Sequence, residues 1–590
     1  MSELCGIGRF VVQYLMTAFR SVCIVFAALI VLLPFAAAQS SPKATVPAHP
    51  WGVYTWGGGE GGKERLPADL PIKGIPLVWH WPELEPLQGQ FAFEKQVRAP
   101  LEKARDGGYY THLMLWVAPV TPEWLYAIGV PRVEVPERIN PFRQRVKPTF
   151  PYYFNPIYIE NFHRTIRALG DYCAALPAGL KERIVFIQVA EGSTGDGQPY
   201  KGLPIDPRFR ITESEWGKFR RETWAVYQQA FQRADGSLRV PLLVNGDANG
   251  PEENAWLLEH CDAFGVKQGM FSHGYLVSET QQRLARWIKF RAEARARGVR
   301  IFSRGEQDGE WKVCGWSKQN PPQAFYWSAL FALHCMLDVW NLPTDALTTQ
   351  PLGETVRMFN RYAGYNEPAS SPVAFCALRR GLDAADTVQF PEDRFGRAQK
   401  GNRDRYLAIA KVYLHLGARQ GDPDKAMGGG MQNRQADDQN DVGWGILAGN
   451  FERHLTQLRP EETSIGLWHV EPSAHPYSLF ARRFDVASGR TVMRFKIADG
   501  FFNKPAAPHA VRLRVVYLDR GTGRRELVYS NPLGEKIARS VELVGSGEWR
   551  EVTLTLPDAT WNGRLGGGDL ALRHAGGADI VFHLIELQRL

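Results

Sequence analysis

Two glutamates stand at the ends of strand-like stretches and could carry out acid–base or nucleophilic chemistry. Glu191 follows the apolar run of RIVFIQVAEGSTGDGQPY (183–200), directly before a glycine-rich loop. Glu306 lies in a second such stretch, VRIFSRGEQDGEW (299–311). A buried parallel strand that ends in a carboxylate and opens into a loop presents that acid at the functional end of a barrel. We therefore expect Glu191 and Glu306 to face each other across one pocket.

Hydrolysis of a glycosidic bond uses such a pair of carboxyl groups. One protonates the departing oxygen and the other attacks the anomeric carbon, with the two groups about 5–5.5 Å apart in a retaining enzyme. We assign Glu191 as general acid/base and Glu306 as nucleophile. The acid must keep its proton, which burial among tryptophans favours, whereas the nucleophile should stay ionised. Asp196 could replace Glu191 and Glu310 could replace Glu306, and either glutamate taken alone could be a solvated loop residue.

Aromatic and amide side chains at the other strand ends suit a sugar better than a metal or a phosphate. Flat aromatic faces stack on sugar rings, and amides bond hydroxyl groups. The substrate-binding candidates are Trp79, His80, Trp81, Trp116, Trp124, Asn245, Gln268, His273, Tyr275, Arg304, Trp311 and Trp340. Arg304 or Tyr275 could also hold the nucleophile ionised. The set contains no cluster of His and Cys, so we expect no metal and no cofactor.

Strand-like and helix-like stretches alternate from residue 48 to residue 346, which predicts a parallel sheet with right-handed crossovers. The strand candidates are 51–56, 75–79, 111–117, 184–190, 240–244, 263–267, 300–304 and 335–340. The helix candidates are 91–105, 157–176, 213–233, 252–260, 278–297 and 322–333. Eight units of this size favour a (β/α)8 TIM barrel. The alternative is an open doubly wound sheet, but WGGGE (56–60) lacks the spacing of its phosphate-binding turn.

The remainder of the chain predicts two further parts. Residues 347–462 should form an accessory helical layer against the barrel, with helices near 352–363 and 403–416. From 463 to 590 the apolar residues alternate in short runs between glycine-rich turns, which is typical of an antiparallel β-sandwich. That sandwich could bind carbohydrate or brace the barrel, and its aromatics Tyr517, Tyr529, Trp549 and Trp561 do not decide between the two.

The N-terminus predicts export. Basic residues precede an apolar run at 21–38 that ends in small residues, as in a signal peptide (1–38) cleaved after Ala38, although a retained membrane anchor is the alternative. The mature protein would be periplasmic or extracellular and not membrane-bound. The net charge of +8 is spread along the 590 residues rather than gathered in a basic block, which argues against nucleic acid as a partner. Five cysteines would remain, with no zinc spacing and at most one bridged pair.

The segment WHWPELEP (79–86), followed by GQFAF (89–93), resembles the second barrel strand of the large clan of retaining (β/α)8 glycoside hydrolases that includes β-galactosidases and agarases. TPEWL (121–125) is similar to the third loop of that clan, and Trp340 falls where the clan has a tryptophan under the sugar. The resemblance implies an acid/base after strand four and a nucleophile after strand seven, at Glu191 and Glu306. The clan usually has Asn before the first glutamate, whereas this chain has Ala190, so the amide contact would come from elsewhere, with Asn245 a candidate.

Two functions of different classes follow. The first is an exported retaining glycosidase that acts on a polysaccharide or oligosaccharide, for instance a β-linked galactan with anionic groups. Arg143, Arg145 and Lys147 could meet such groups, or could simply form a solvated basic loop. The second is a non-catalytic glycan-binding protein on a degenerate barrel, for which Ala190 is the best support. A polysaccharide lyase would need a base set or calcium cluster that the sequence does not clearly place.

Overall fold

The structure is a computed structural model that describes residues 49–590 apart from 58–65, 140–144, 147, 247–248, 276–278, 314, 422–439 and 472–474. The predicted signal peptide at 1–38 lies outside the described residues, as do Arg143, Lys147 and Cys314. No helix within the described residues combines the length and the apolar character that a bilayer crossing needs.

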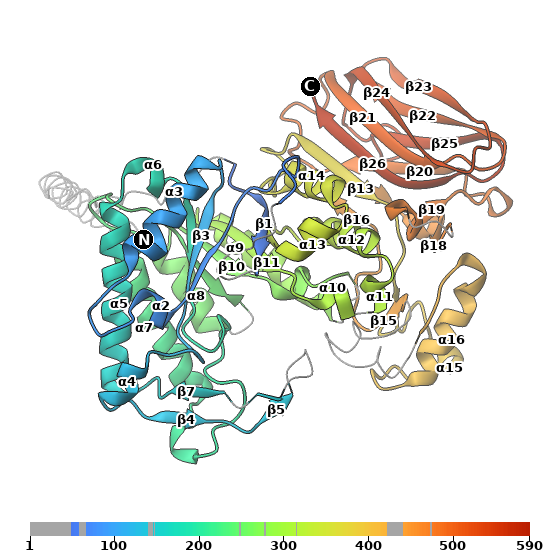
Figure 1. The fold of residues 1–590 in the computed structure, drawn as a ribbon. Helices are drawn as coiled ribbons and strands as arrows, with labels where there is room; N and C mark the ends of the chain where they lie inside the picture. The colour runs from blue at the N-terminus through green and yellow to red at the C-terminus, as the bar shows by residue number, and fades with distance from the viewer. Residues whose placement is uncertain are drawn as a thin grey trace, which may run out of the picture. The chain divides into compact units, whose positions relative to one another are not determined.

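Eight parallel strands form the first sheet, in the order β1-β12-β11-β10-β9-β8-β3-β2 (Figure 1). They are β1 (Gly52–Trp56), β2 (Leu77–His80), β3 (Thr111–Trp116), β8 (Ile184–Gln188), β9 (Leu242–Asn245), β10 (Ala263–Lys267), β11 (Arg300–Glu306) and β12 (Val339–Pro343). The ring closes through Gly74, which bridges Tyr54 of β1 to Tyr110 just before β3. A Cβ on Gly74 would lie 2.1 Å from the Tyr54 ring, so only glycine permits this approach. The predicted (β/α)8 barrel is confirmed.

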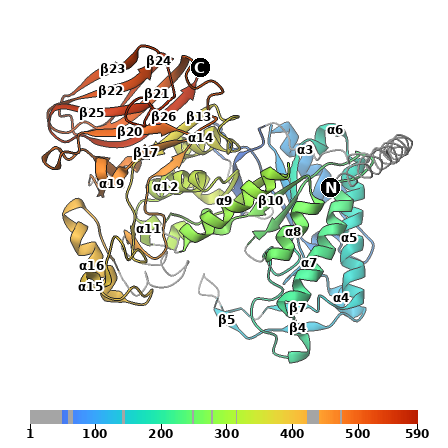
Figure 2. The ribbon, with the colours of Figure 1, turned by 180° about the vertical axis from the view of Figure 1, so that it is seen from behind.

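The helices that cover these strands begin where the sequence provides caps. They are α5 (Pro156–Ala175), α7 (Glu213–Phe231), α8 (Pro251–His260), α9 (Thr280–Ala296), α12 (Pro321–His334) and α14 (Gly353–Tyr362), and the two views show α5, α7 and α8 outside the strands (Figures 1 and 2). The Asn155 side chain accepts from the Ile157 N–H (2.9 Å) ahead of Pro156. Thr212 and Glu215 form a capping box at the start of α7. Both motifs satisfy N–H groups that a helix start leaves unpaired.

The eighth strand begins later than the sequence predicts. The prediction placed it at 335–340, whereas α12 continues to His334, Cys335 caps it, and β12 starts at Val339. The apolar residues run without a break from the helix into the strand, so they carry no periodic signal for the boundary. Within β12 the Asn341 side chain, rather than Trp340, faces the interior of the barrel, where it accepts from Arg304 Nε (2.7 Å).

Two antiparallel sheets follow the barrel, as predicted. One contains β13 (Val373–Ala377), β16 (Phe451–Arg453), β18 (Ile465–Trp468), β19 (Phe480–Arg483), β21 (His509–Leu518), β24 (Trp549–Ala559) and β26 (Val581–Arg589). The other contains β17 (Leu455–Leu458), β20 (Val492–Ile497), β22 (Gly523–Asn531), β23 (Gly534–Leu543) and β25 (Leu570–Gly577). β13, β16 and β17 come from the stretch expected to form the accessory layer. β13 pairs directly with β26, so the sandwich draws strands from well before residue 463.

The sandwich packs on the barrel helix α12 through aromatic side chains. The Tyr326 hydroxyl lies 2.8 Å from His583 Nε2, and the Trp327 indole N–H donates to the Pro476 carbonyl (2.9 Å). Three of the four sandwich aromatics that did not decide between carbohydrate binding and bracing are buried, namely Tyr517, Tyr529 and Trp561. Their burial favours a bracing role over glycan binding at these residues. The four cysteines that the structure describes are free and buried, namely Cys173, Cys261, Cys335 and Cys376.

Candidate active site

Alternation along β11 points both Arg304 and Glu306 into the barrel. Arg304 is fully buried, and its Nη1 donates to Gln188 Oε1 on β8 (2.9 Å) while its Nε donates to Asn341 Oδ1 on β12 (2.7 Å). The guanidinium carbon also lies 4.3 Å from the centre of the Trp56 ring. Because three strands hold one side chain, Arg304 is fixed at the carboxyl end of the barrel, where the fold places its active sites.

Glu306 lies one layer above Arg304 and is held between two cations. Lys267 Nζ at the end of β10 is 2.6 Å from Glu306 Oε1, and Arg304 forms a second ion pair with it. Burial alone would raise the pKa of Glu306, but Arg304 and Lys267, with a smaller contribution from His273, lower it to about 2. Glu306 is therefore a carboxylate over the whole physiological range, as a nucleophile must be.

A further carboxylate at this end of the barrel, and the one that shares Lys267 with Glu306, is Asp196, on the loop that follows β8. Lys267 Nζ lies 3.5 Å from Asp196 Oδ1 as well as 2.6 Å from Glu306 Oε1, so these two oxygens are no more than about 6 Å apart. Lys201 forms a further ion pair with Asp196. The loop returns over the barrel because Gly195 adopts φ +71°, and a Cβ there would lie 2.7 Å from Trp116 Nε1. Asp196 thus takes the place that we assigned to Glu191.

Glu191 points to the other side of the sheet. Its Oε1 accepts from Arg220 Nε on α7 (3.1 Å) and from the Trp224 indole N–H, and both charged side chains are fully buried. The reason is the two-residue period of a strand. Gln188 faces the interior, so Glu191, three residues later, faces the helices. The structure therefore does not bring Glu191 and Glu306 together.

Three aromatic side chains do reach the barrel mouth. The rings of His80 and Trp116 are 5.4 Å apart in an edge-to-face contact, and both are partly exposed. Trp56, at the end of β1, covers Arg304 and donates from its indole N–H to Asp308 Oδ1 (2.8 Å). Trp56 is one of the residues that we did not predict for the site, and the others are Gln188, Lys201 and Lys267.

The remaining tryptophan candidates face the surrounding helices. Trp79 donates to the Gln96 carbonyl (2.9 Å), and Trp340 is fully buried against Phe325 and Phe359. Trp311 packs near Phe325, while Trp81 and Trp124 contact each other and the buried carboxylate and backbone of Glu85. Trp79 and Trp340 lie at strand positions whose side chains face the helices. The other three lie in short helices after the strands, namely α2 (Trp81–Leu84), α4 (Glu123–Ala127) and α10 (Glu310–Val313), so none of the five offers a face at the barrel mouth beside Glu306.

The other candidates divide between the site and its surroundings. Asn245 is interior, with its Nδ2 3.5 Å from the Gly195 carbonyl. The Gln268 N–H donates to the Arg304 carbonyl (2.8 Å), directly above Lys267. Tyr275 lies against Phe480 of β19, away from Glu306. The side chains of Glu310 and Arg145 are outside the described part of the structure. Within that part, no group of three or more His, Cys, Asp or Glu residues is arranged to hold a metal.

The comparisons with known proteins bear only on the fold. Neither a scan against protein-family models nor a search of curated proteins found a match. Among solved structures the chain is similar to the β-amylase catalytic domain of Paenibacillus polymyxa (11% identity, TM-score 0.33, 49% of this chain and 90% of that chain). It is also similar to the β-galactosidase of Rahnella sp. R3 (13%, 0.33, 50% and 53%) and a GH30 endoxylanase of Clostridium papyrosolvens C71 (8%, 0.30, 93% and 98%). At these TM-scores the assignment of the site depends on the residues above.

Proposed function

We propose that the chain is a retaining glycoside hydrolase in which Glu306 is the nucleophile and Asp196 the general acid/base. The observation that carries the proposal is Lys267, which contacts both carboxylates and so limits their separation to about 6 Å. A retaining mechanism needs about 5–5.5 Å between the two groups, and an inverting one about 6.5–9.5 Å. The position at the carboxyl ends of the barrel strands supports the same conclusion.

In the first step, a Glu306 oxygen attacks the anomeric carbon while Asp196, in its protonated form, gives its proton to the departing glycosidic oxygen. The products are a glycosyl ester on Glu306 and a free sugar end. In the second step, Asp196 removes a proton from water, the water oxygen attacks the anomeric carbon, and the ester bond to Glu306 breaks. Arg304 and Lys267 stabilise Glu306 as a carboxylate before attack and after release. Trp56, Trp116 and His80 are placed to contact the sugar.

The substrate class follows from the same residues. The mouth combines aromatic faces with amides and a balanced set of charges, which suits a polysaccharide or oligosaccharide. A β-linked galactan with anionic groups remains the example that the sequence resemblance favours, and such groups would have to compete with Asp196 and Glu306 for Lys201 and Lys267. Export to the periplasm or the extracellular space is part of the proposal, because polymeric glycans occur there.

A non-catalytic glycan-binding barrel is the second candidate, and one observation favours it. Lys267 sits between the two carboxylates, and Lys201 also contacts Asp196, so Asp196 must gain its proton in the presence of two ammonium groups. A substrate that displaces Lys267 would remove one of these two positive charges from Asp196. A non-catalytic binding protein, by contrast, does not need a protonated Asp196. The two functions differ in whether any glycosidic bond is cleaved.

The deciding experiment compares wild type with Glu306→Gln and Asp196→Asn on galactan, xylan, mannan and β-glucan. We expect wild type to release reducing sugar with retention at the anomeric carbon, followed by NMR, and Glu306→Gln to be inactive. Asp196→Asn should lose activity on glycans but keep it on aryl glycosides with good leaving groups, and azide should restore turnover by replacing the activated water. Glu191→Gln is the matched control and should keep the activity of wild type. Binding of a glycan without cleavage by wild type would establish the second candidate.

A further inference from the structure

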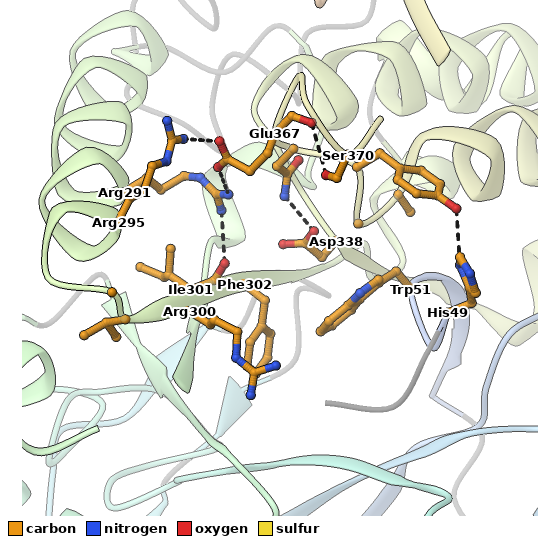
Figure 3. Close-up of a pocket in the computed structure, with 16 residues that line it drawn as sticks. His49, Trp51, Arg291, Arg295, Arg300, Ile301, Phe302, Asp338, Glu367 and Ser370 are labelled. Atoms are coloured by element: carbon orange, nitrogen blue, oxygen red, sulfur yellow. Dashed lines mark hydrogen bonds and ion pairs between the residues drawn. The ribbon is translucent and has the colours of Figure 1, made fainter. Parts of the chain in front are cut away.

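A cavity of about 620 Å³ opens at the amino ends of the barrel strands, opposite the candidate active site (Figure 3). Its lining comes from the residues before β1, from α9 and the start of β11, from Asp338 before β12, and from the loop after α14. Strand β11 separates the two places, since Arg300 lines the cavity and Glu306 ends the strand. Phe302 is the lining residue of β11 nearest to Glu306, and at about 3.3 Å per residue the two are about 13 Å apart along the strand, so a ligand in the cavity does not touch Glu306.

The floor of the cavity is aromatic and fixed in position. The rings of Trp51 and Phe302 lie 5.3 Å apart, and Gly364 at φ +80° brings the chain so close that a Cβ would lie 2.1 Å from the Trp51 indole. At the rim, the Tyr365 hydroxyl is 3.3 Å from His49 Nδ1. A floor held by packing needs no reorganisation on binding, which favours a flat ligand face.

The charged groups around this floor are three arginines, Arg291, Arg295 and Arg300, and two acids, Glu367 and Asp338. Glu367 pairs with Arg295 and, at 3.6 Å, with Arg291. Asp338 is buried and accepts from the Ser303 N–H (2.8 Å) and from Asn366 Nδ2 (2.7 Å). A phosphate would have to compete with Glu367 for the arginines. A hydroxylated ring could instead bond the exposed edges of Glu367 and Arg295, whose side chains are 40% and 63% exposed.

We infer that this cavity is a second, non-catalytic binding site for one or a few sugar units, with Trp51 as its stacking surface. The choice of a sugar as the ligand class rests on the proposed function, whereas the site itself rests on the cavity. Its place at the far end of the barrel would let the protein hold a long glycan at two points. Two linked contacts raise the apparent affinity for a polymer above that for a short oligosaccharide.

The test uses the full chain with Glu306→Gln, titrated calorimetrically with tetraoses of β-1,4-linked galactose, xylose, mannose and glucose, and with inorganic phosphate. We expect two sites for at least one tetraose. Adding Trp51→Ala should weaken one site by about tenfold, the upper range for an aromatic contact, and Trp116→Ala should weaken the other. A single site that Trp51→Ala leaves unchanged, or no tetraose binding at all, overturns the inference.

A rim variant covers the case in which Trp51→Ala does not fold. Glu367→Ala should weaken the same tetraose site and expose Arg291 and Arg295 to phosphate, while Glu354→Ala, a surface acid outside the cavity, should change neither. Tight phosphate binding before Glu367 is removed would identify an anion site and overturn the inference. If wild type cleaves no glycan but the Trp51-dependent site persists, only the proposed hydrolysis fails.

Discussion

Glu191→Gln should destabilise the barrel without slowing the chemistry, and this separates Glu191 from Asp196 directly. Glu191 and Arg220 are fully buried with Nε and Oε1 3.1 Å apart, and removal of one partner from such a pair costs about 3–5 kcal/mol. Arg220 keeps the Asn245 carbonyl (3.2 Å) and Asn249 Oδ1 (2.9 Å), so we expect about 3 kcal/mol for Glu191→Gln. Arg220→Met leaves the Glu191 carboxylate with only the Trp224 N–H among its described partners, so it should cost more, about 5 kcal/mol.

The assay follows tryptophan fluorescence through urea unfolding and measures kcat well below the unfolding temperature. In the double variant the loss should be smaller than the sum of the single losses, because neither charge is then left unpaired. Glu191→Gln should keep kcat within about threefold, whereas Asp196→Asn should lose about 100-fold or more, the usual contribution of a general acid. A large loss of kcat in Glu191→Gln with unchanged unfolding would refute the reasoning and return the acid role to Glu191.

Three further predictions concern the charges near the site. Because the pKa of Glu306 in the folded protein is about 2, its ionisation contributes about 3 kcal/mol to the free energy of unfolding above pH 4–5, and this contribution is lost as the pH falls towards 2. The difference in unfolding free energy between wild type and Glu306→Gln should therefore shrink over the same pH range. A difference that does not change with pH would contradict this. Lys267→Met should move the acidic limb of kcat/KM to higher pH, while Lys201→Met, whose ion pair is with Asp196 rather than Glu306, should not. Glu85→Ala should lower the unfolding free energy by about 3 kcal/mol at unchanged kcat, since its buried carboxylate accepts from four donors. An effect on kcat would place Glu85 in the chemistry.

The barrel could be predicted because its strands are apolar, short and regularly separated by helices. Two details could not. The closure at Gly74 depends on one glycine before β2, which gives no strand signal by itself. The early sandwich strand β13 reads VAFCA and is buried on both faces, so it lacks the alternation that revealed the later strands. Its pairing with β26 joins residues more than 200 positions apart, and local patterns carry no information on such contacts.

The site could be predicted in part, and the error at Glu191 has a physical origin. A strand buried on both faces is apolar throughout, so its sequence does not say which residues face the interior. Glu306 was assigned correctly to the carboxyl end of its strand, and Arg304 two residues earlier shares its face. In β8 the polar residue Gln188 was the available signal, because a glutamine within an apolar strand must find a partner inside the barrel. Every second residue after Gln188 shares its face, so Ala190 faces the interior of the barrel and Glu191 does not.

The buried pair of Glu191 and Arg220 nevertheless bears on where the acid lies. Arg220 binds Glu191 at the end of β8, the Asn245 carbonyl at the end of β9 and Asn249 beyond it, so one side chain of α7 fixes two neighbouring strand ends. The loop that carries Asp196 starts from the first of these ends, and its Gly195 carbonyl is 3.5 Å from the Asn245 amide of the second. The Arg220 side chain thus holds, through both strand ends, the loop that carries Asp196. Arg220 keeps its two contacts at the end of β9 when Glu191 is replaced. We therefore expect a change in the length of this loop to displace Asp196, and to lower kcat, more than Glu191→Gln does.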